Sequence, residues 1–343
     1  MIFPVIANLE NPDLSAELQA LLDNKTKPPG SLGRLEQLAV QIGLILNTTT
    51  PVLQNPQMLV CAGDHGLVKR GVSAFPQDVT WQMVENFLAG GAAVSVLAQQ
   101  HGIALTIADC GVAHEFSPRP LLRDCKVAPG TADCTQQAAM TAEQCQKALH
   151  NGAELVQGLS GNVLMLGEMG IANTASASLI LSRLGGHDIA LCTGAGTGLD
   201  DAGIRHKTAV LAEALGRHQQ ITEPLSVLAT FGGFEIATMT GAFLQAAAEN
   251  RVILVDGFIV CSALLVAMHV NPLVLQRCIF SHKSAERGHT LMLQTLNAEP
   301  LFDLELRLGE GSGAAVAWPL LQSACSVLNN MASFSQAGVE QAA

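Results

Sequence analysis

The stretch from Val252 to Val270 reads VILVDGFIVCSALLVAMHV, and it decides the fold of this chain. It is long and apolar enough to cross a membrane, but Asp256 and Gly257 interrupt it after four apolar residues. A short, continuous apolar run that ends in Asp-Gly is typical of a strand covered on both faces, and the run that follows is long enough for a helix. The stretch therefore predicts a buried strand and then a buried helix rather than a membrane span.

Five other short apolar runs also end next to glycine or a polar residue. They are Met58–Ala62, Leu105–Ala108, Val163–Leu166, Ile189–Cys192 and Cys278–Phe280. Because most of the six runs precede a helical pattern, they predict a doubly wound, mainly parallel α/β sheet of six strands. The segment Pro118–Ala139 is predicted to be a long polar loop.

Residues typical of helix ends delimit two of the helices. The capping box Thr141-Ala-Glu-Gln opens a helix over Ala142–Val156. Asn173 or Thr174 is expected to cap a helix over Ala175–Leu184, and the two glycines that follow would end it.

Both ends of the chain have helical patterns. Residues 1–50 contain two helical stretches, and Gly313–Met331 forms another, in which Pro319 is expected to cause a kink or a break. We expect the two ends to pack together as a small helical lobe, 1–50 plus 313–343. This lobe would lie beside an α/β domain over 51–312 that carries the catalytic site.

The composition excludes several classes of protein. Of 343 residues, 49% are apolar and 14% are charged, which indicates a large core and leaves surface for burial in an oligomer. The net charge is −11 and no Lys/Arg cluster is present, so no nucleic-acid partner is expected. The nine cysteines form no CxxC pair and the N-terminus does not resemble a signal peptide, so we expect free thiols in a reducing cytoplasm.

Polar residues follow the predicted strands where each strand ends. In a doubly wound sheet, ligands bind beyond the carboxyl ends of the strands, so these residues are expected to face a ligand. They include Asp64-His65, Asp109, Glu168, Asp256 and Ser281-His282-Lys283. The ten histidines have no HExxH or other clear ligand spacing, so a metal site is not expected.

The segment Gly194-Ala-Gly-Thr-Gly-Leu199 lies between a predicted strand and a helix. Closely spaced glycines let backbone N–H groups approach a phosphate. The GxGxG spacing differs from the dinucleotide fingerprint and lacks its acidic partner, so a phosphate or ribose loop is favoured over that fold and over a plain tight turn. Lys207, in the helix that follows, either reaches an anion or is a solvated surface charge.

Two glutamates stand at the ends of apolar runs. Glu168, before Asn173 and Thr174, either hydrogen-bonds a ribose hydroxyl or has a structural role. Glu310, between two glycines in LRLGEGSGAAVAWPL, is either a solvated loop charge or a carboxylate at the lip of an apolar pocket, where it could act as a general base. The pair Asp200-Asp201 follows a glycine loop and is interpreted as a helix start.

Several stretches together resemble one family, the nicotinate-nucleotide–dimethylbenzimidazole phosphoribosyltransferases of cobalamin assembly. They cover about residues 25–320 in family order, and as a set they are far more specific than one glycine loop. The stretches are Thr26–Glu36, Ala62–Gly66, Gly71–Gln77 with Thr80 and Gln82, Asn86–Ala93, Gly167–Ile171 with Asn173-Thr174, Gly196–Asp201, Gly232–Ile236, Val255–Phe258, Ser284–Glu286 and Leu306–Ala314.

The resemblance implies a reaction and a fold. Nicotinate mononucleotide would donate its phosphoribosyl group to 5,6-dimethylbenzimidazole, giving α-ribazole 5′-phosphate and nicotinate with inversion at the anomeric carbon. The implied fold is a Rossmann-like parallel sheet with a small helical domain built from both chain ends, assembled as a homodimer. No metal or other cofactor is implied, because the leaving group is nicotinate rather than pyrophosphate.

The resemblance also assigns roles to residues. Glu310 matches the general base that takes a proton from the acceptor ring, and Glu168 and Lys207 match positions near the ribosyl phosphate. Implied substrate contacts are Ser73, Gln82, Met169 and Leu308 around the flat base, with Gly170, Gly194, Gly196, Thr197, Gly198 and Ser284 near the ribose or phosphate.

The chain departs from the family pattern at a few positions. Ala172 stands where glycine is expected and would crowd its turn, and Cys110 stands where an aliphatic residue is expected. On the residues alone, a nicotinamide-dependent dehydrogenase and a non-catalytic nucleotide or base sensor stay open. The missing GxGxxG argues against the first, and the intact Glu310, Glu168 and Lys207 argue against the second.

Overall fold

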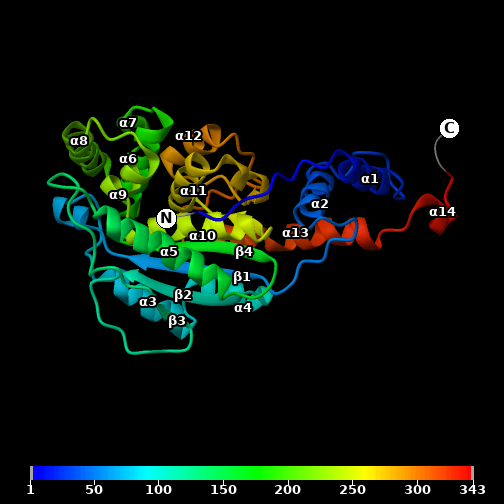
Figure 1. The fold of residues 1–343 in the computed structure, drawn as a ribbon, viewed down its shortest axis with the longest axis horizontal. Helices are drawn as coiled ribbons and strands as arrows, with labels where there is room; N and C mark the ends of the chain where they lie inside the picture. Colours follow the sequence, from blue (N-terminus) through cyan, green and yellow to red (C-terminus); the bar gives the residue numbers. More distant parts are fainter. Residues whose placement is uncertain (1–2, 341–343) are drawn as a thin grey trace.

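The core of the chain is a sheet of six strands in the order β3-β2-β1-β4-β5-β6 (Figure 1). The computed structural model describes residues 3–340. The strands are β1 (Gln57–Gly63), β2 (Ala104–Gly111), β3 (Leu122–Asp124), β4 (Val163–Met169), β5 (Val252–Val255) and β6 (Cys278–Phe280). All neighbouring strands are parallel, so the predicted Rossmann-like, doubly wound sheet is confirmed.

Alternate residues of the central strand β1 contribute to two separate cores. Leu59 and Cys61 belong to one core, and Met58 and Val60 belong to the other. Since every residue of β1 is buried, the strand has a continuous apolar sequence instead of an alternating one.

The helices divide between these two cores. The first core includes α5 (Ala142–Gln157), α6 (Asn173–Gly185), α8 (Asp201–Arg217), α9 (Pro224–Phe231), α10 (Phe234–Ala248), α11 (Phe258–Val270), η2 (Pro272–Arg277) and α12 (Arg287–Thr295). The second includes α1 (Pro12–Asp23), α2 (Arg34–Ile45), α3 (Val79–Ala89), α4 (Ala93–His101) and α13 (Ser312–Asn330). A short helix, η1 (Gly66–Arg70), follows β1.

The prediction of a strand at Ile189–Cys192 is wrong, because these residues form one helical turn, α7. Asp188 caps the turn by accepting a hydrogen bond from the N–H of Ala190, at 2.8 Å. Four apolar residues do not distinguish a strand from a helical turn. The sixth strand is β3 instead, inside the segment predicted to be a polar loop, and its three residues are half-buried or exposed. A short edge strand of this kind has no apolar signature.

The capping box of α5 is present as predicted, with hydrogen bonds in both directions between Thr141 and Gln144. The predicted cap of α6 is wrong. The N-cap is Ala172, in the left-handed region with φ 77°, and Asn173 already belongs to the helix. A non-glycine residue is strained in that conformation, which agrees with the crowding expected at Ala172.

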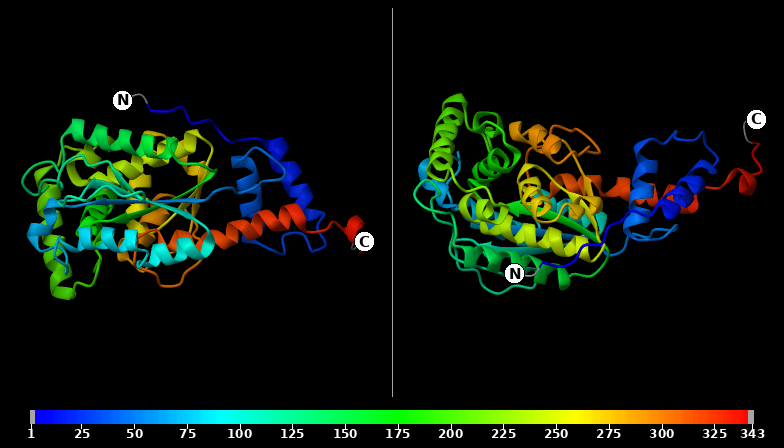
Figure 2. Two further views of the ribbon diagram at one scale, coloured as in Figure 1. Left: turned by 90° about the horizontal axis from the view of Figure 1, so that it is seen from below. Right: turned by 45° about the horizontal axis from the view of Figure 1, so that its top comes forward.

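Helices from both chain ends lie together at one end of the molecule (Figures 1 and 2). Helices α1 and α2 pack against each other, α2 packs against α13, and the short α14 (Phe334–Ala337) follows. Helix α13 runs unbroken through Pro319, and its first turns, at Ala314, share the second core with the sheet. The division into 1–50 plus 313–343 and 51–312 stays a prediction, and residues 1–2 and 341–343 lie outside the described part.

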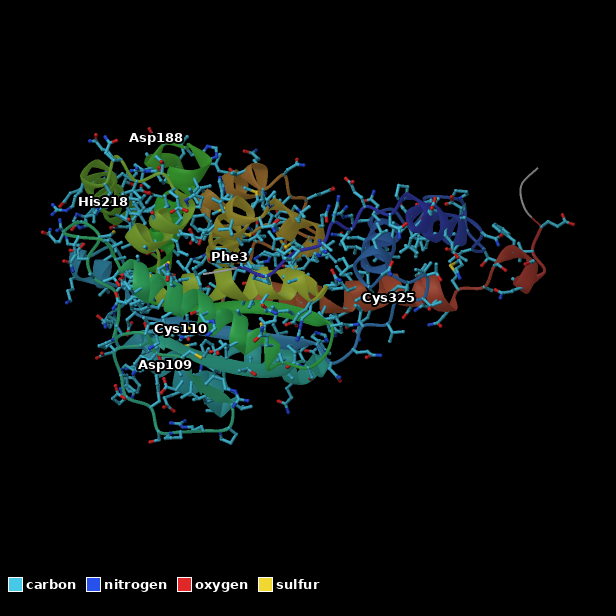
Figure 3. The ribbon with its side chains drawn as sticks, in the orientation of Figure 1. Phe3, Asp109, Cys110, Asp188, His218 and Cys325 are labelled. Carbon is cyan, nitrogen blue, oxygen red and sulfur yellow. The ribbon has the colours of Figure 1, made fainter. Side chains whose placement is uncertain are left out.

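The nine cysteines are all free thiols; eight of them are buried, and Cys125 is half-buried. Figure 3 places Cys110 on the sheet and Cys325 far away, along α13. Within residues 3–340, no helix combines the length and apolarity needed to cross a membrane, and Val252–Val270 forms β5 and α11, as predicted.

Candidate active site

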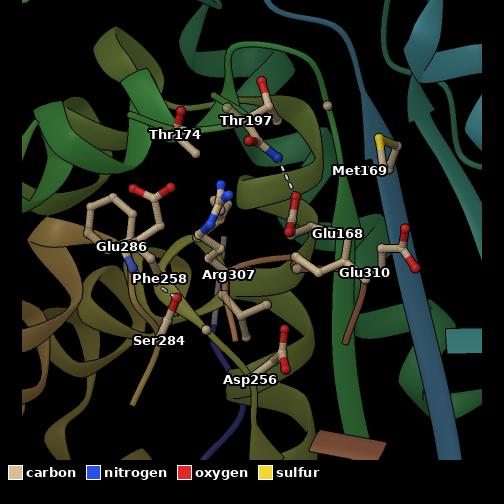
Figure 4. Close-up of a pocket in the computed structure, with 18 of the residues that line it drawn as sticks. Glu168, Met169, Thr174, Thr197, Asp256, Phe258, Ser284, Glu286, Arg307 and Glu310 are labelled. Atoms are coloured by element: carbon tan, nitrogen blue, oxygen red, sulfur yellow. Dashed lines mark hydrogen bonds between the residues drawn. The ribbon is translucent and has the colours of Figure 1, made fainter. Parts of the chain in front are cut away.

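A cavity of about 320 Å³ opens beyond the carboxyl ends of β4, β5 and β6 (Figure 4). One part of its lining is apolar, and another part has carboxylates, hydroxyls and a guanidinium. The apolar residues include Phe75, Val79, Met83, Met169, Ile171, Phe258 and Leu308, and the polar residues include Glu168, Asn173, Thr174, Thr197, Asp256, His282, Ser284, Glu286, Arg307 and Glu310. The cavity lies where a doubly wound sheet binds its ligands.

Glu310 is buried in this cavity, with 3% of its surface exposed, so it is not a solvated loop charge. Its carboxylate accepts a hydrogen bond of 3.4 Å from the N–H of Val94, in the first turn of α4. Burial raises the pKa of Glu310, the Val94 N–H opposes this rise, and the charge of Asp256 adds to it. The result is a desolvated carboxylate, a stronger base than one in water.

The backbone around Glu310 forms an unusual turn. Gly309, Glu310 and Gly311 all have positive φ, at 88°, 65° and 90°. A glutamate in this region costs of order 1 kcal/mol and persists only where its surroundings fix it. Asp256, at the end of β5, fixes this turn by accepting hydrogen bonds from the N–H groups of Gly311 at 3.2 Å and Ala314 at 3.0 Å.

Glu168, at the end of β4, is also buried and accepts a very short hydrogen bond from the side-chain amide of Asn173. Burial raises the pKa of Glu168 to about 8, and the charges of Asp256 and Glu235 add to the effect, while Asn173 opposes it. Near neutral pH this group can therefore both hold and release a proton.

Lys207 is 1% exposed, so it is not a solvated surface charge. It extends from α8 beneath the glycine loop, and its Nζ donates hydrogen bonds to Thr174 Oγ1 at 2.8 Å and to the Gly194 carbonyl at 3.5 Å. Burial lowers the pKa of Lys207 to about 8, and Glu286 opposes that lowering. A buried cation beside the cavity can attract an anionic group of a ligand.

The glycine loop follows the helical turn α7 and not a strand, but it does reach the cavity. Gly196 and Thr197 line the cavity, whereas Gly194 and Gly198 line an adjoining one of about 420 Å³. Arg307 and Glu286 line both cavities. The loop is therefore shared by the two spaces, and Arg307 borders both of them.

Most of the predicted substrate contacts line the main cavity, and four do not. Met169, Gly170, Gly196, Thr197, Ser284 and Leu308 line it, whereas Ser73, Gln82, Gly194 and Gly198 are not in its lining. Gln82 is exposed on α3, and the neighbouring Val79 and Met83 line the cavity instead. Residues four apart share a helix face, so the apolar face of α3 points into the cavity and Gln82 lies off it. The roles of all the predicted contacts stay predictions.

Sequence reasoning did not assign roles to several lining residues. Asp256 was noted only as a strand end, although that position was a usable signal for a ligand-facing carboxylate. Arg307 and Phe258 had no signal of their own in the pattern. No three His, Cys, Asp or Glu side chains within residues 3–340 come together as a metal site would require.

Comparisons with known proteins agree with this site. A family model described as "Phosphoribosyltransferase" matches residues 8–339. The nicotinate-nucleotide–dimethylbenzimidazole phosphoribosyltransferase of Variovorax paradoxus is 61% identical over 98% of this chain and 97% of its own. The enzyme of the same name from Dechloromonas aromatica is 57% identical, over 95% of each chain.

Two solved structures are also similar to this chain over nearly its whole length. The nicotinate-nucleotide–dimethylbenzimidazole phosphoribosyltransferase of Thermus thermophilus is 37% identical, with a TM-score of 0.92 over 97% of this chain and 100% of its own. A structure of CobT from the same organism is 38% identical, with a TM-score of 0.93 over 96% of this chain and 100% of that one. The chain therefore belongs to the nicotinate-nucleotide–dimethylbenzimidazole phosphoribosyltransferase family.

Proposed function

We propose that this enzyme transfers the phosphoribosyl group of nicotinate mononucleotide to 5,6-dimethylbenzimidazole. The products are α-ribazole 5′-phosphate and nicotinate, and the reaction serves cobalamin nucleotide assembly. The observation that carries the proposal is the buried Glu310 carboxylate, which lies in a largely apolar cavity with a cation-flanked glycine loop. The relatives named as nicotinate-nucleotide–dimethylbenzimidazole phosphoribosyltransferases support the same reaction.

The lining suits the two substrates. Met83, Met169 and Leu308 offer apolar surface to a flat methylated ring. Gly196 and Arg307 offer donors to a phosphate, with the buried Lys207 behind them. Because one methyl group changes binding by only ~1–3 kcal/mol, we expect loose selectivity among benzimidazole-type bases.

The chemistry is one in-line displacement. A ring nitrogen of the benzimidazole attacks the anomeric carbon with its lone pair, from the face opposite to nicotinate. The bond from that carbon to the pyridinium nitrogen breaks, and its electron pair returns to the ring, which neutralises the ring nitrogen. The β-linkage of the donor thereby becomes an α-linkage in the product.

The attacking ring becomes cationic and must lose the proton on its other nitrogen. Glu310, held in place by Asp256 and by the Val94 N–H, accepts that proton in its ionised form. Glu168 would face the ribose, where its carboxyl group can hydrogen-bond a hydroxyl. These steps use only the residues of this chain.

The test is to incubate the protein with nicotinate mononucleotide and dimethylbenzimidazole and to separate the α-ribotide by chromatography. We expect product with wild type and a loss of at least about 100-fold in kcat with Glu310→Gln. Glu305→Gln is a matched control, because Glu305 is an exposed glutamate in the same segment and also has positive φ, at 57°. Failure of the wild-type protein to form product would refute the proposal and would favour a non-catalytic sensor.

We also propose that the enzyme is a homodimer in a reducing cytoplasm. The support is the low content of charged residues (14%), exposed apolar side chains such as Leu21 and Leu304, and nine free cysteines. Light scattering after gel filtration measures the mass directly, and a monomer at micromolar concentration would contradict the dimer.

A further inference from the structure

Two sequence motifs have no part in this chemistry, yet their side chains meet in one buried contact behind the cavity. They are Ala62-Gly-Asp-His-Gly66, at the end of β1, and Gly232-Gly-Phe-Glu-Ile236, at the start of α10. His65 Nε2 lies 2.6 Å from Glu235 Oε1, and the two residues are 2% and 0% exposed. The contact therefore joins two elements that are far apart in the chain.

The same histidine reaches the loop between β4 and α6, which follows Glu168. His65 Nδ1 lies 3.0 Å from the hydroxyl of Ser176, in the first turn of α6. A Cβ atom at Gly170 would lie 3.3 Å from the His65 ring and would overlap the carbonyl oxygen of Gly63. The ring thus packs closely behind the loop that supplies Met169 and Gly170 to the cavity.

The contact with Glu235 favours the protonated form of His65. Burial alone would lower the pKa of His65, but attraction by Glu235 and then by Asp64 outweighs it, so the pKa is raised. With both ring nitrogens protonated, His65 donates to Glu235 and to Ser176. The second carboxylate oxygen of Glu235 is buried without a hydrogen-bond partner among residues 3–340, and His65 Nε2 contacts the other oxygen. When His65 is protonated, it compensates the charge of Glu235.

The charge of Glu235 matters to Glu168. Besides burial, which has the largest effect, two groups raise the pKa of Glu168: Asp256, from the end of β5, and Glu235, from α10. The groups that lower it are the Asn173 amide, from α6, and the Glu310 N–H, before α13. We therefore expect a change in the charge of Glu235 or His65 to change the pKa of Glu168.

We propose that His65 and Glu235 are positioning residues for Glu168: the pair supports the loop between β4 and α6 from behind, and His65 screens Glu168 from the charge of Glu235. The proposal rests on the proposed function only for the part that Glu168 plays in catalysis. The support of the loop and the screening need no substrate, so they can be tested separately.

The test is a titration of Glu168 followed by ¹³C NMR of labelled glutamate carboxyl carbons, with the resonance assigned by its loss in Glu168→Gln. In His65→Gln, Glu235 is uncompensated, so we expect the ionisation constant of Glu168 to fall about tenfold, which is a rise of about one pKa unit. In Glu235→Gln we expect a smaller change in the opposite direction, because a charge that raises the pKa of Glu168 is removed while His65 loses the partner that favours its proton. The double variant should titrate close to wild type.

Opposite shifts distinguish screening from general structural damage, which would move both single variants in the same direction. Shifts in the same direction, or no shift in Glu235→Gln, would overturn the proposal. If His65→Gln does not fold, Glu235→Gln and the double variant still test the screening, because neither variant leaves an uncompensated buried glutamate. The control is Glu36→Gln. It breaks another buried pair, at 2.8 Å, between Lys27 in the loop after α1 and Glu36 in α2, and it should leave Glu168 unchanged.

Kinetics provide a second measurement. We expect each single variant to shift the pH profile of kcat in the same direction as it shifts the pKa of Glu168. The KM for dimethylbenzimidazole should change less than kcat. A pH profile identical to wild type in both single variants would remove the positioning role. An absence of transferase activity in wild type would refute the proposed function instead, and the NMR result would stand by itself.

Discussion

Replacing Lys207 by methionine should stabilise the folded protein while it weakens the site. Burial lowers the pKa of Lys207 from 10.5 to about 8. At about 1.4 kcal/mol for each pKa unit, this corresponds to about 3 kcal/mol of unfavourable free energy in the charged native state at neutral pH. Loss of the hydrogen bonds to Thr174 and Gly194 offsets about 1 kcal/mol of that gain. We therefore expect Lys207→Met to be about 2 kcal/mol more stable at pH 7.

The pH dependence has a definite sign. Below pH 8 the lysine is charged in both the native and the unfolded chain, so the whole penalty is present in wild type. Between pH 8 and 10.5 the native state loses its proton first, so the stability of wild type rises relative to the variant. The advantage of Lys207→Met should therefore be largest near pH 7 and should shrink as the pH rises.

The assay is urea unfolding of both proteins at pH 7 and near pH 9.5, under reducing conditions because of the free thiols. Lys69→Met, at an exposed lysine in η1, is the control and should change the free energy of unfolding by less than about 0.5 kcal/mol. Added phosphate should stabilise wild type more than Lys207→Met, because the variant lacks the buried cation. A variant less stable than wild type at pH 7, or a difference that does not shrink with pH, would refute this reasoning.

Four other outcomes are expected. Ala172→Gly should raise the free energy of unfolding by about 0.5–1 kcal/mol in urea, since glycine relieves the strain at φ 77°, and a lower value would contradict it. Gly167→Ala should lower it by about 1–3 kcal/mol, because a Cβ there overlaps the carbonyl of Glu310, and an unchanged urea midpoint would be evidence against that contact. As the pH falls, kcat should begin to drop at a pH above the ordinary carboxyl range, because the raised pKa of Glu310 means that the base is protonated there. A drop that begins only at pH 4.5 or below would exclude Glu310 as its source. Cys125 should react slowly with a thiol reagent at pH 7, since burial raises its pKa to about 12, and fast labelling there would contradict this burial.

The sequence predicted the strands that are buried on both faces, because burial imposes a continuous apolar run. Five of the six predicted runs are strands, and each leads to a polar residue where the sheet ends. The failures have the same physical origin. The run at Ile189–Cys192 was too short to distinguish a strand from a helical turn, and β3 lies at the sheet edge, where no second face has to be covered.

The site was predicted in part. Glu168 was found because it follows an apolar run, and Glu310 because it is a lone charge between two glycines before an apolar helical pattern. Both are in the cavity. The burial of Lys207 could not be predicted, because a lysine in a helix has the same pattern whether its side chain points inward or outward. The left-handed turn at Glu310 has no signal in the residue itself, since only the flanking glycines suggest it.

Helix α13 connects the turn that contains Glu310 to the helices at the two ends of the chain. It starts two residues after Glu310, spans 19 residues and ends among the helices of the chain ends, so it is a rod about 28 Å long. A tilt of about 2° around its far end would displace the site end by about 1 Å, a misplacement that typically costs an enzyme about 100-fold in rate. Because α2, itself packed against α1, holds α13 away from the site, a contact that shifts these N-terminal helices would also move the turn that contains Glu310.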